Sequence, residues 1–169
     1  MKDLKKHNVI VWSVFFLSAL LLSLTAVASA QDDRSCTMVG RAGEYGFAWT
    51  GTIVLPTGAV PFAVVGKSTF DAVGNFSSTS TASVGGQISH TTGKGAYTLN
   101  SDCTGTLTSS NYDKSGNLVN ILTADTVSLD NMREARGIMT SLVLANGTHL
   151  PVVITLNARK VFPNGDNEQ

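Results

Sequence analysis

The stretch Gly95-Ala-Tyr-Thr-Leu-Asn-Ser-Asp-Cys-Thr-Gly105 carries the features that decide the fold of this chain. It predicts a strand that ends at Asn100, a polar turn, and a second strand that begins at Thr104. Asn, Ser and Asp favour turns because their side chains bond nearby backbone groups. The turn also contains Cys103, one of only two cysteines in the chain. We therefore expect a β-hairpin that is covalently tied to another segment.

The first thirty residues have the pattern of a secretory signal peptide. Three lysines among the first six residues precede an apolar run over 9–24, and Ala28-Ser29-Ala30 has the small-residue pattern of a cleavage site. Cleavage there predicts an extracellular or periplasmic protein of 139 residues without stable membrane insertion. The alternative is an uncleaved anchor, because the apolar stretch 9–28 is nearly long enough to span a bilayer.

The two cysteines, Cys36 and Cys103, both lie in the expected mature chain. In an oxidising compartment they predict one disulfide. It would close a loop of about 68 residues and stabilise the fold by about 4 kcal/mol in the chain-entropy model. Two unrelated free thiols are the alternative, and the spacing excludes a redox-active C-x-x-C motif.

Charge and composition exclude several classes of partner. The mature chain has nine basic and eleven acidic residues, so its net charge is about −2. This is neither a basic nucleic-acid-binding footprint nor a polyanion, and no nucleic-acid partner is expected. The chain is rich in Thr, Ser, Gly and Val and has no helical apolar period. Regular Gly and Asn punctuation is typical of short strands joined by turns.

The pattern predicts eight strands in up-and-down order. Eight antiparallel strands in under 140 residues suit a closed all-β barrel, which also removes exposed sheet edges. The domain organisation is then a signal peptide (1–30), a disulfide-tethered segment (31–43), the barrel (44–162) and a disordered polar tail (163–169). The expected strands cover 45–55, 62–70, 76–84, 90–100, 104–111, 119–129, 134–144 and 150–161.

The first strand has one strongly apolar face. Tyr45, Phe47 and Trp49 alternate with small or polar residues, so this face should be buried. Phe62 and Tyr97 lie on the apolar faces of later strands. Trp49 has two interpretations, a wall that stacks against a ligand or a core aromatic that closes one end of the barrel.

The hairpin over 119–144 allows a prediction of register. With Asn131-Met132 as a two-residue loop, Leu129 opposes Glu134 and Ile121 opposes Leu142. This register places the more apolar faces of both strands on the same, inward side.

That inward side also carries Asp125, Glu134 and Arg136. One hypothesis is a carboxylate with a perturbed pKa, held by the arginine inside an apolar cavity, which orients a polar ligand or acts as a general acid or base. The alternative is an ion pair near the barrel rim that satisfies its own charges. The isolated His90 and His149 do not predict a metal site, and no cofactor is expected.

The last hairpin contains Asn146-Gly147. A strict two-residue loop would put Ile154 and Leu156 outside, whereas a three-residue loop with a bulge would turn them inward. The irregularity expected at Pro151 favours the bulge.

Four segments of the chain are Gly43-Glu-Tyr-Gly-Phe47, Gly66-Lys-Ser-Thr-Phe-Asp71, the 95–105 stretch and Arg133-Glu-Ala-Arg136. These segments resemble those of a group of secreted bacterial proteins of unknown function. The architecture is in turn similar to calycin-type barrels, namely lipocalins, avidins and allene-oxide-cyclase-like proteins. The resemblance implies a small ligand in the barrel mouth, although fold alone does not fix function. Met132 departs from the group, which tends to have glycine there.

Three functions follow as hypotheses. The first is a non-enzymatic binding module for a small, mostly apolar molecule. The second is an isomerase or cyclase that resembles allene-oxide cyclases and needs a carboxylate in the cavity. The third is a structural or surface-interaction protein with a packed barrel. The candidate ligand-binding residues are Tyr45, Phe47, Trp49, Phe62, Tyr97, Asp125, Glu134 and Arg136.

Overall fold

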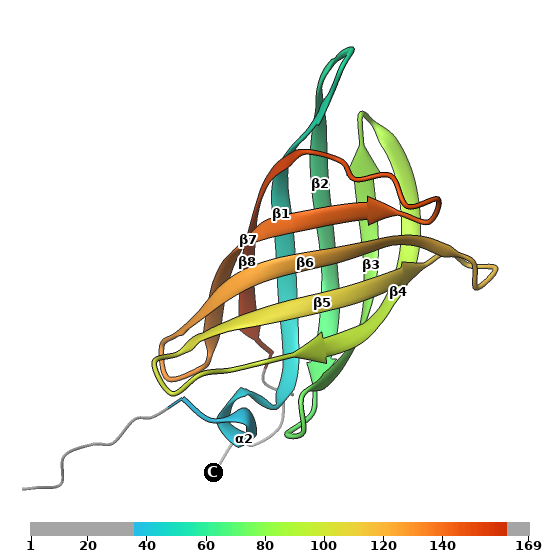
Figure 1. The fold of residues 1–169 in the computed structure, drawn as a ribbon. Coiled ribbons are helices and arrows are strands. Elements are labelled where there is room, and N and C mark those ends of the chain that lie inside the picture. Colours follow the sequence, from blue (N-terminus) through green and yellow to red (C-terminus); the bar gives the residue numbers. More distant parts are fainter. Residues whose placement is uncertain (1–35, 162–169) are drawn as a thin grey trace, which may run out of the picture. The chain divides into compact units, whose positions relative to one another are not determined.

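The computed structural model describes residues 36–161, so the expected signal peptide and polar tail lie outside the described residues. No helix among residues 36–161 is long and apolar enough to cross a membrane. One short helix, α2, precedes eight strands (Figure 1). Their bounds are α2 Met38–Arg41, β1 Gly43–Leu55, β2 Gly58–Phe70, β3 Asn75–Val84, β4 Gln87–Tyr97, β5 Thr104–Tyr112, β6 Leu118–Leu129, β7 Glu134–Leu144 and β8 Val152–Lys160.

The strands form a closed antiparallel barrel in the order β1 to β8, with β1 also paired to β8. This confirms the eight-stranded up-and-down barrel. β2 begins earlier than expected, because Leu55 pairs directly with Gly58 across a two-residue connection. Pro61, which was expected in that connection, lies within β2 opposite Thr52.

The up-and-down order gives the barrel two distinct ends. We call the end that carries α2 and the turns after Phe70, Tyr97 and Leu129 the α2 end (Figure 1). We call the opposite end, with the other four hairpin turns, the hairpin end. A cluster of aromatic rings fills the α2 end, with the Phe70 ring 5.4 Å from that of Tyr45 and 5.0 Å from that of Tyr97.

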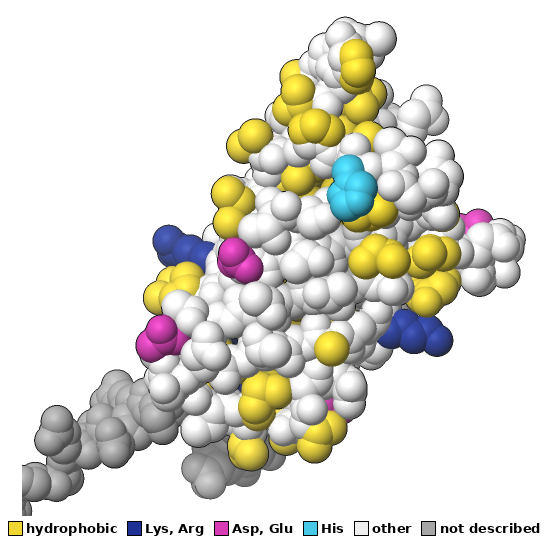
Figure 2. Space-filling view, viewed as in Figure 1, with side chains coloured by type: hydrophobic (Ala, Val, Ile, Leu, Met, Phe, Trp, Pro, Cys, Tyr) yellow, Lys and Arg dark blue, Asp and Glu magenta, His cyan; other side chains and the backbone are white. Residues whose placement is uncertain are grey.

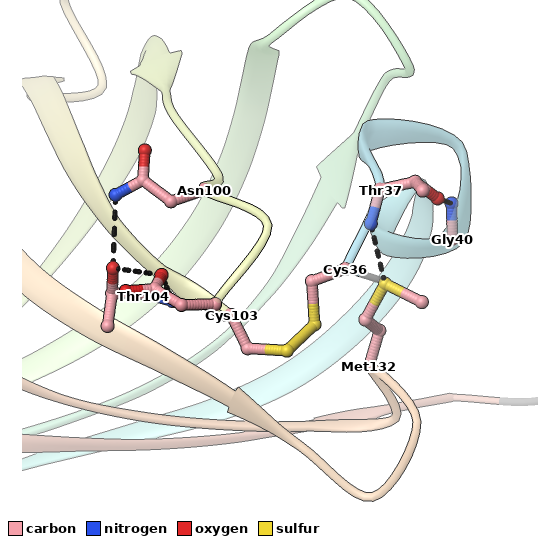
Figure 3. Close-up of a disulfide and its surroundings, with 8 residues drawn as sticks. Cys36, Thr37, Gly40, Asn100, Cys103, Thr104 and Met132 are labelled. Carbon is pink, nitrogen blue, oxygen red and sulfur yellow. Dashed lines mark hydrogen bonds between the residues drawn. A yellow bond between two sulfur atoms is a disulfide. The ribbon is translucent and has the colours of Figure 1, made fainter. Parts of the chain in front are cut away.

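The disulfide between Cys36 and Cys103 is present, with the two Cα atoms 5.0 Å apart. It joins the chain just before α2 to the turn between β4 and β5 (Figure 3). Thr37 caps α2 by accepting a hydrogen bond from Gly40 N at 3.1 Å, and its own N–H donates to Met132 Sδ at 3.4 Å. The predicted tether is confirmed, and a disulfide is consistent with an oxidising compartment.

The β6–β7 register is partly as predicted. Next to the turn, Leu129 pairs with Glu134 as expected. A β-bulge that leaves Thr140 unpaired then shifts the ladder, so Ile121 pairs one residue beyond its expected partner, Leu142.

The predicted inward face is wrong for β6 and for the part of β7 next to the turn, whereas beyond the bulge Leu142 is buried as predicted. Val127 and Leu129 are 36% and 37% exposed, and the residues that face the interior are Ala124, Ser128 and Ala135. The physical reason is the space available at the α2 end. Because aromatic rings already fill the barrel there, only small side chains fit on the facing strands. The larger β-branched residues therefore lie outside, where they still favour the strand.

The β7–β8 connection is the three-residue loop that was favoured. Leu144 N donates to Thr148 O at 2.9 Å, which leaves residues 145–147 in the loop. Ile154 and Leu156 point inward and are 0% and 4% exposed. This prediction is confirmed.

Two turns share an Asp-x-x-Gly-Asn sequence and the same hydrogen bonds. Asp71 Oδ1 accepts from Asn75 N at 2.8 Å, and Asp113 Oδ1 accepts from Asn117 N at 2.9 Å. In both turns the second carboxylate oxygen accepts from the asparagine Nδ2. These hydrogen bonds lower the pKa of both aspartates below the ordinary value of 3.8. The hydrogen bond from the asparagine side chain has the largest effect on each pKa.

The two turns predict a loss of stability in acid. Because the folded pKa values are depressed, the stabilisation is complete above about pH 4 and disappears as the pH falls through the folded values. A variant with Asp71→Ala and Asp113→Ala should be less stable at neutral pH and lose less stability on acidification. Urea unfolding midpoints measured from about pH 7 to pH 2 test this. Equal pH slopes for variant and wild type would contradict the assignment.

Candidate ligand-binding cavity

The barrel encloses a cavity of about 310 Å³. It reaches from Arg41 and Phe70 at the α2 end to Val84 and Leu150 at the hairpin end. Ligand pockets have volumes of about 300 to 1,000 Å³, so this cavity is at the small end of that range.

One side of the cavity is apolar. Phe47, Trp49 and Phe62 come from β1 and β2, and Met139 and Leu156 come from β7 and β8. The four strands are neighbours because β1 closes the barrel onto β8, so their alternating inward residues form one continuous wall.

The opposite side carries a stripe of neutral polar groups on β3 to β6. Asn111 Nδ2 donates to Asn120 Oδ1 at 2.8 Å, and Ser109 Oγ donates to Asn111 Oδ1 at 3.1 Å. Gly93 makes room for this group, since a Cβ there would lie only 2.4 Å from Ser78 Oγ. We call Ser78, Ser80, Ser89, Thr91, Ser109, Asn111 and Asn120 the polar stripe, and all of them border the cavity.

Tyr45 and Tyr97 belong to the aromatic cluster at the α2 end and do not border the cavity. Their hydroxyls donate to the backbone oxygens of Met132 and Asp71, respectively. Burial raises the pKa of both tyrosines, so both remain neutral donors. They fix the turns of the α2 end to the core.

Arg41 is the one charged residue that borders the cavity among the described residues. It is only 4% exposed, and its guanidinium carbon lies 4.4 Å from the ring centre of Tyr45 and 4.7 Å from that of Phe70. Burial lowers its pKa, which the neighbouring tyrosines Tyr45 and Tyr97 partly oppose. Its Nη1 atom is buried and has no hydrogen-bond partner among residues 36–161.

The structure divides the predicted site residues into three groups. Phe47, Trp49 and Phe62 line the cavity, and Tyr45 and Tyr97 pack beneath it.

Asp125, Glu134 and Arg136 form the third group and lie on the outer surface. Their predicted inward orientation is wrong, because next to the β6–β7 turn the residues that face the interior are Ala124, Ser128 and Ala135. Glu134 and Arg136 form an ion pair of 2.8 Å in which the arginine side chain is 63% exposed. Asp125 is also exposed and lies opposite Ile138.

The sequence interpretation missed Arg41 and the polar stripe. A signal for the stripe existed, because Ser78, Ser80 and Ala82 alternate along β3 with outward residues. Arg41 had no periodic signal, since it precedes the first strand.

The outer surface offers a second, shallower hollow of about 520 Å³ over β2 to β4, bordered among others by Lys67, Thr79, His90 and Lys114. On the face viewed in Figure 2, apolar side chains are scattered among polar ones and charged side chains are few. Among residues 36–161, no group of three or more His, Cys, Asp or Glu side chains is placed to hold a metal ion.

Comparison of the chain with protein-family models, with curated proteins and with solved structures finds no match. The calycin-type resemblance therefore stays a prediction.

Proposed function

We propose that the protein is a secreted, non-enzymatic barrel that binds a small, mostly apolar molecule in its interior. The observation that carries this proposal is the cavity of about 310 Å³ between an apolar wall and the polar stripe. Small-molecule sites are mostly apolar concavities with a few polar groups that fix orientation. A barrel with a purely structural role gains nothing from a cavity of this size, because a core that its side chains do not fill is less stable.

The isomerase alternative is not proposed. It depended on a carboxylate inside the cavity, and Asp125 and Glu134 both lie outside it. The polar groups that do border the cavity are hydroxyls, amides and the guanidinium of Arg41. These groups suit binding and orientation of a ligand.

Filling the cavity tests the proposal. Ala82 on β3 borders the cavity and pairs with Val64 on the neighbouring strand β2. Ala82→Trp should therefore place an indole in the space that a ligand would occupy. We expect this variant to lose the ability to bind an apolar compound. Its free energy of unfolding should change by less than about 1 kcal/mol, because the indole occupies the cavity and displaces no core side chain. Binding is measured by calorimetric titration with small apolar compounds and by native mass spectrometry of the protein purified from its own host.

Ala63→Trp is the matched control, because Ala63 is exposed at the same level of the neighbouring strand. This variant should bind as the wild type does. The proposal is wrong if the wild type neither carries nor binds an apolar molecule, or if Ala82→Trp binds as tightly as the wild type.

A further inference from the structure

We propose that the ligand is an amphiphilic anion, an apolar molecule with one carboxylate, and that the Arg41 guanidinium binds this carboxylate at the α2 end of the cavity. The inference rests on the proposed function, since it assigns a chemical class to the ligand of the same cavity.

Arg41 is a buried cation without a counter-ion in the described part of the chain. Within residues 36–161, ion pairs join Lys67 to Glu44 and Arg136 to Glu134, and neither pair includes Arg41. Among residues 36–161, the neighbours that raise the pKa of Arg41 are the tyrosines Tyr45 and Tyr97, and no carboxylate is among them. Taking a charged side chain out of water is costly unless an opposite charge or hydrogen bonds compensate for it. An anionic ligand would supply this compensation.

One nitrogen of the guanidinium, Nη1, has no hydrogen-bond partner among residues 36–161. Tyr45 and Phe70 contact the group through cation–π interactions, which use the flat face of the cation. The N–H groups point outward in the plane of the guanidinium, and their fork matches the two oxygens of a carboxylate. Because Arg41 borders the cavity and its buried Nη1 atom lacks a partner, we place the carboxylate beside the guanidinium at this end of the cavity.

The surroundings of Arg41 are positively charged. Lys160 Nζ donates to Gly40 O at 2.9 Å and lies 5.6 Å from the ring centre of Tyr45, the same ring that Arg41 contacts. Burial lowers the pKa of Lys160, and the charges of Arg41 and Arg133 lower it further. Two cations, Arg41 and Lys160, therefore lie near the same aromatic ring at this end of the barrel, and their charge favours an anion there.

The residues that line the cavity limit the ligand to one charged group. Above Arg41 the wall consists of apolar side chains such as Trp49, Phe62 and Leu150 and of the neutral polar stripe. A carboxylate bound at the α2 end would place an apolar tail along this wall toward the hairpin end. A second charge on the tail would be buried without a partner.

The test compares acids with the alcohols of equal chain length. Octanoic, decanoic and dodecanoic acid and the corresponding alcohols are titrated calorimetrically into the full-length protein at neutral pH. We expect the wild type to bind the acid that fits best at least about tenfold more tightly than its alcohol, because hydrogen bonds to charged groups have this magnitude. Arg41→Met should lose the preference and bind acid and alcohol equally.

Arg159→Met is the matched control. Arg159 is exposed on β8 next to Lys160, so this substitution removes the same charge from the outside of the same end. The control should keep the preference for the acid. Equal binding of acid and alcohol by the wild type would overturn the anionic ligand and leave the proposed function intact, whereas no binding of either would overturn both.

A second measurement needs no variant. The carboxyl group of the bound acid, labelled with carbon-13, is titrated by NMR in the wild-type protein. Contact with Arg41 should lower the pKa of this carboxyl below that of the free acid, since a nearby cation favours the ionised form. An unchanged or raised pKa would overturn the inference even if Arg41→Met fails to fold.

Discussion

Replacement of both Cys36 and Cys103 by alanine is expected to lower the free energy of unfolding by about 4 kcal/mol. The bond joins residues 67 apart in the sequence, so its removal returns a large amount of conformational freedom to the unfolded chain. Because single domains are stable by only about 5 to 15 kcal/mol, this loss would be a large part of the total.

The structural effect should be concentrated at the α2 end. A helix of four residues is too short to be stable by itself, so α2 depends on its tertiary contacts. Apart from the disulfide, these contacts include two hydrogen bonds. The Thr37 N–H donates to Met132 Sδ, and Lys160 Nζ donates to Gly40 O. Without the disulfide we expect α2 to detach, so that Arg41 becomes accessible to trypsin.

Urea unfolding of the wild type and the double variant, each with and without a reductant, measures the effect. Reductant should shift the wild-type midpoint to that of the variant and leave the variant unchanged. A difference in stability of less than about 1 kcal/mol between the two proteins would contradict the chain-entropy argument.

The eight strands were predictable because alternation and turn residues are local signals. In β1 the inward residues Tyr45, Trp49 and Ile53 are apolar and all three are buried. The turns at Gly74 and Gly116 contain glycines with φ of 99° and 83°, a conformation that glycine adopts readily. The order of the strands then followed from their number and their short connections.

The inward face of β6 was not predictable by counting apolar residues. Val127 and Leu129 made one face more apolar, whereas the interior required Ala124 and Ser128. This requirement comes from the aromatic rings of distant strands, and no local pattern contains that information. Because of this error, Asp125, Glu134 and Arg136 were predicted to lie in the cavity, which they do not border.

The backbone conformation of the turn between β6 and β7 also depends on contacts that no local sequence pattern contains. Asp130, Asn131 and Met132 all have left-handed backbone, with φ of 48°, 54° and 64°, although none of them is glycine. Left-handed residues other than glycine are disfavoured locally. Contacts far along the chain compensate here, because Met132 Sδ accepts from Thr37 and Met132 O accepts from Tyr45. The sequence showed the absence of glycine but not these contacts.

Gly95→Ala is expected to destabilise the barrel by about 3 kcal/mol. A Cβ at Gly95 would lie 1.9 Å from Thr108 O and 3.1 Å from Phe76 Cε1. The first contact involves the backbone of the neighbouring strand β5, which cannot move aside without breaking the ladder between β4 and β5. Gly105 is similar, with a Cβ that would lie 2.2 Å from Thr98 O. The two glycines that bound the 95–105 stretch therefore allow close packing of backbones, in addition to any role in the turn.

Gly46→Ala is the matched control, because Gly46 also lies within a strand but its Cβ would meet only Val161 Cγ2, at 3.7 Å. This substitution should be neutral or stabilise the protein by up to about 1 kcal/mol, since alanine is less flexible than glycine in the unfolded chain. Urea midpoints of the two variants, compared with the wild type, separate close packing from a general effect of glycine in strands. If Gly95→Ala were as stable as Gly46→Ala, the close approach of β4 and β5 at Gly95 would not limit the stability of the barrel.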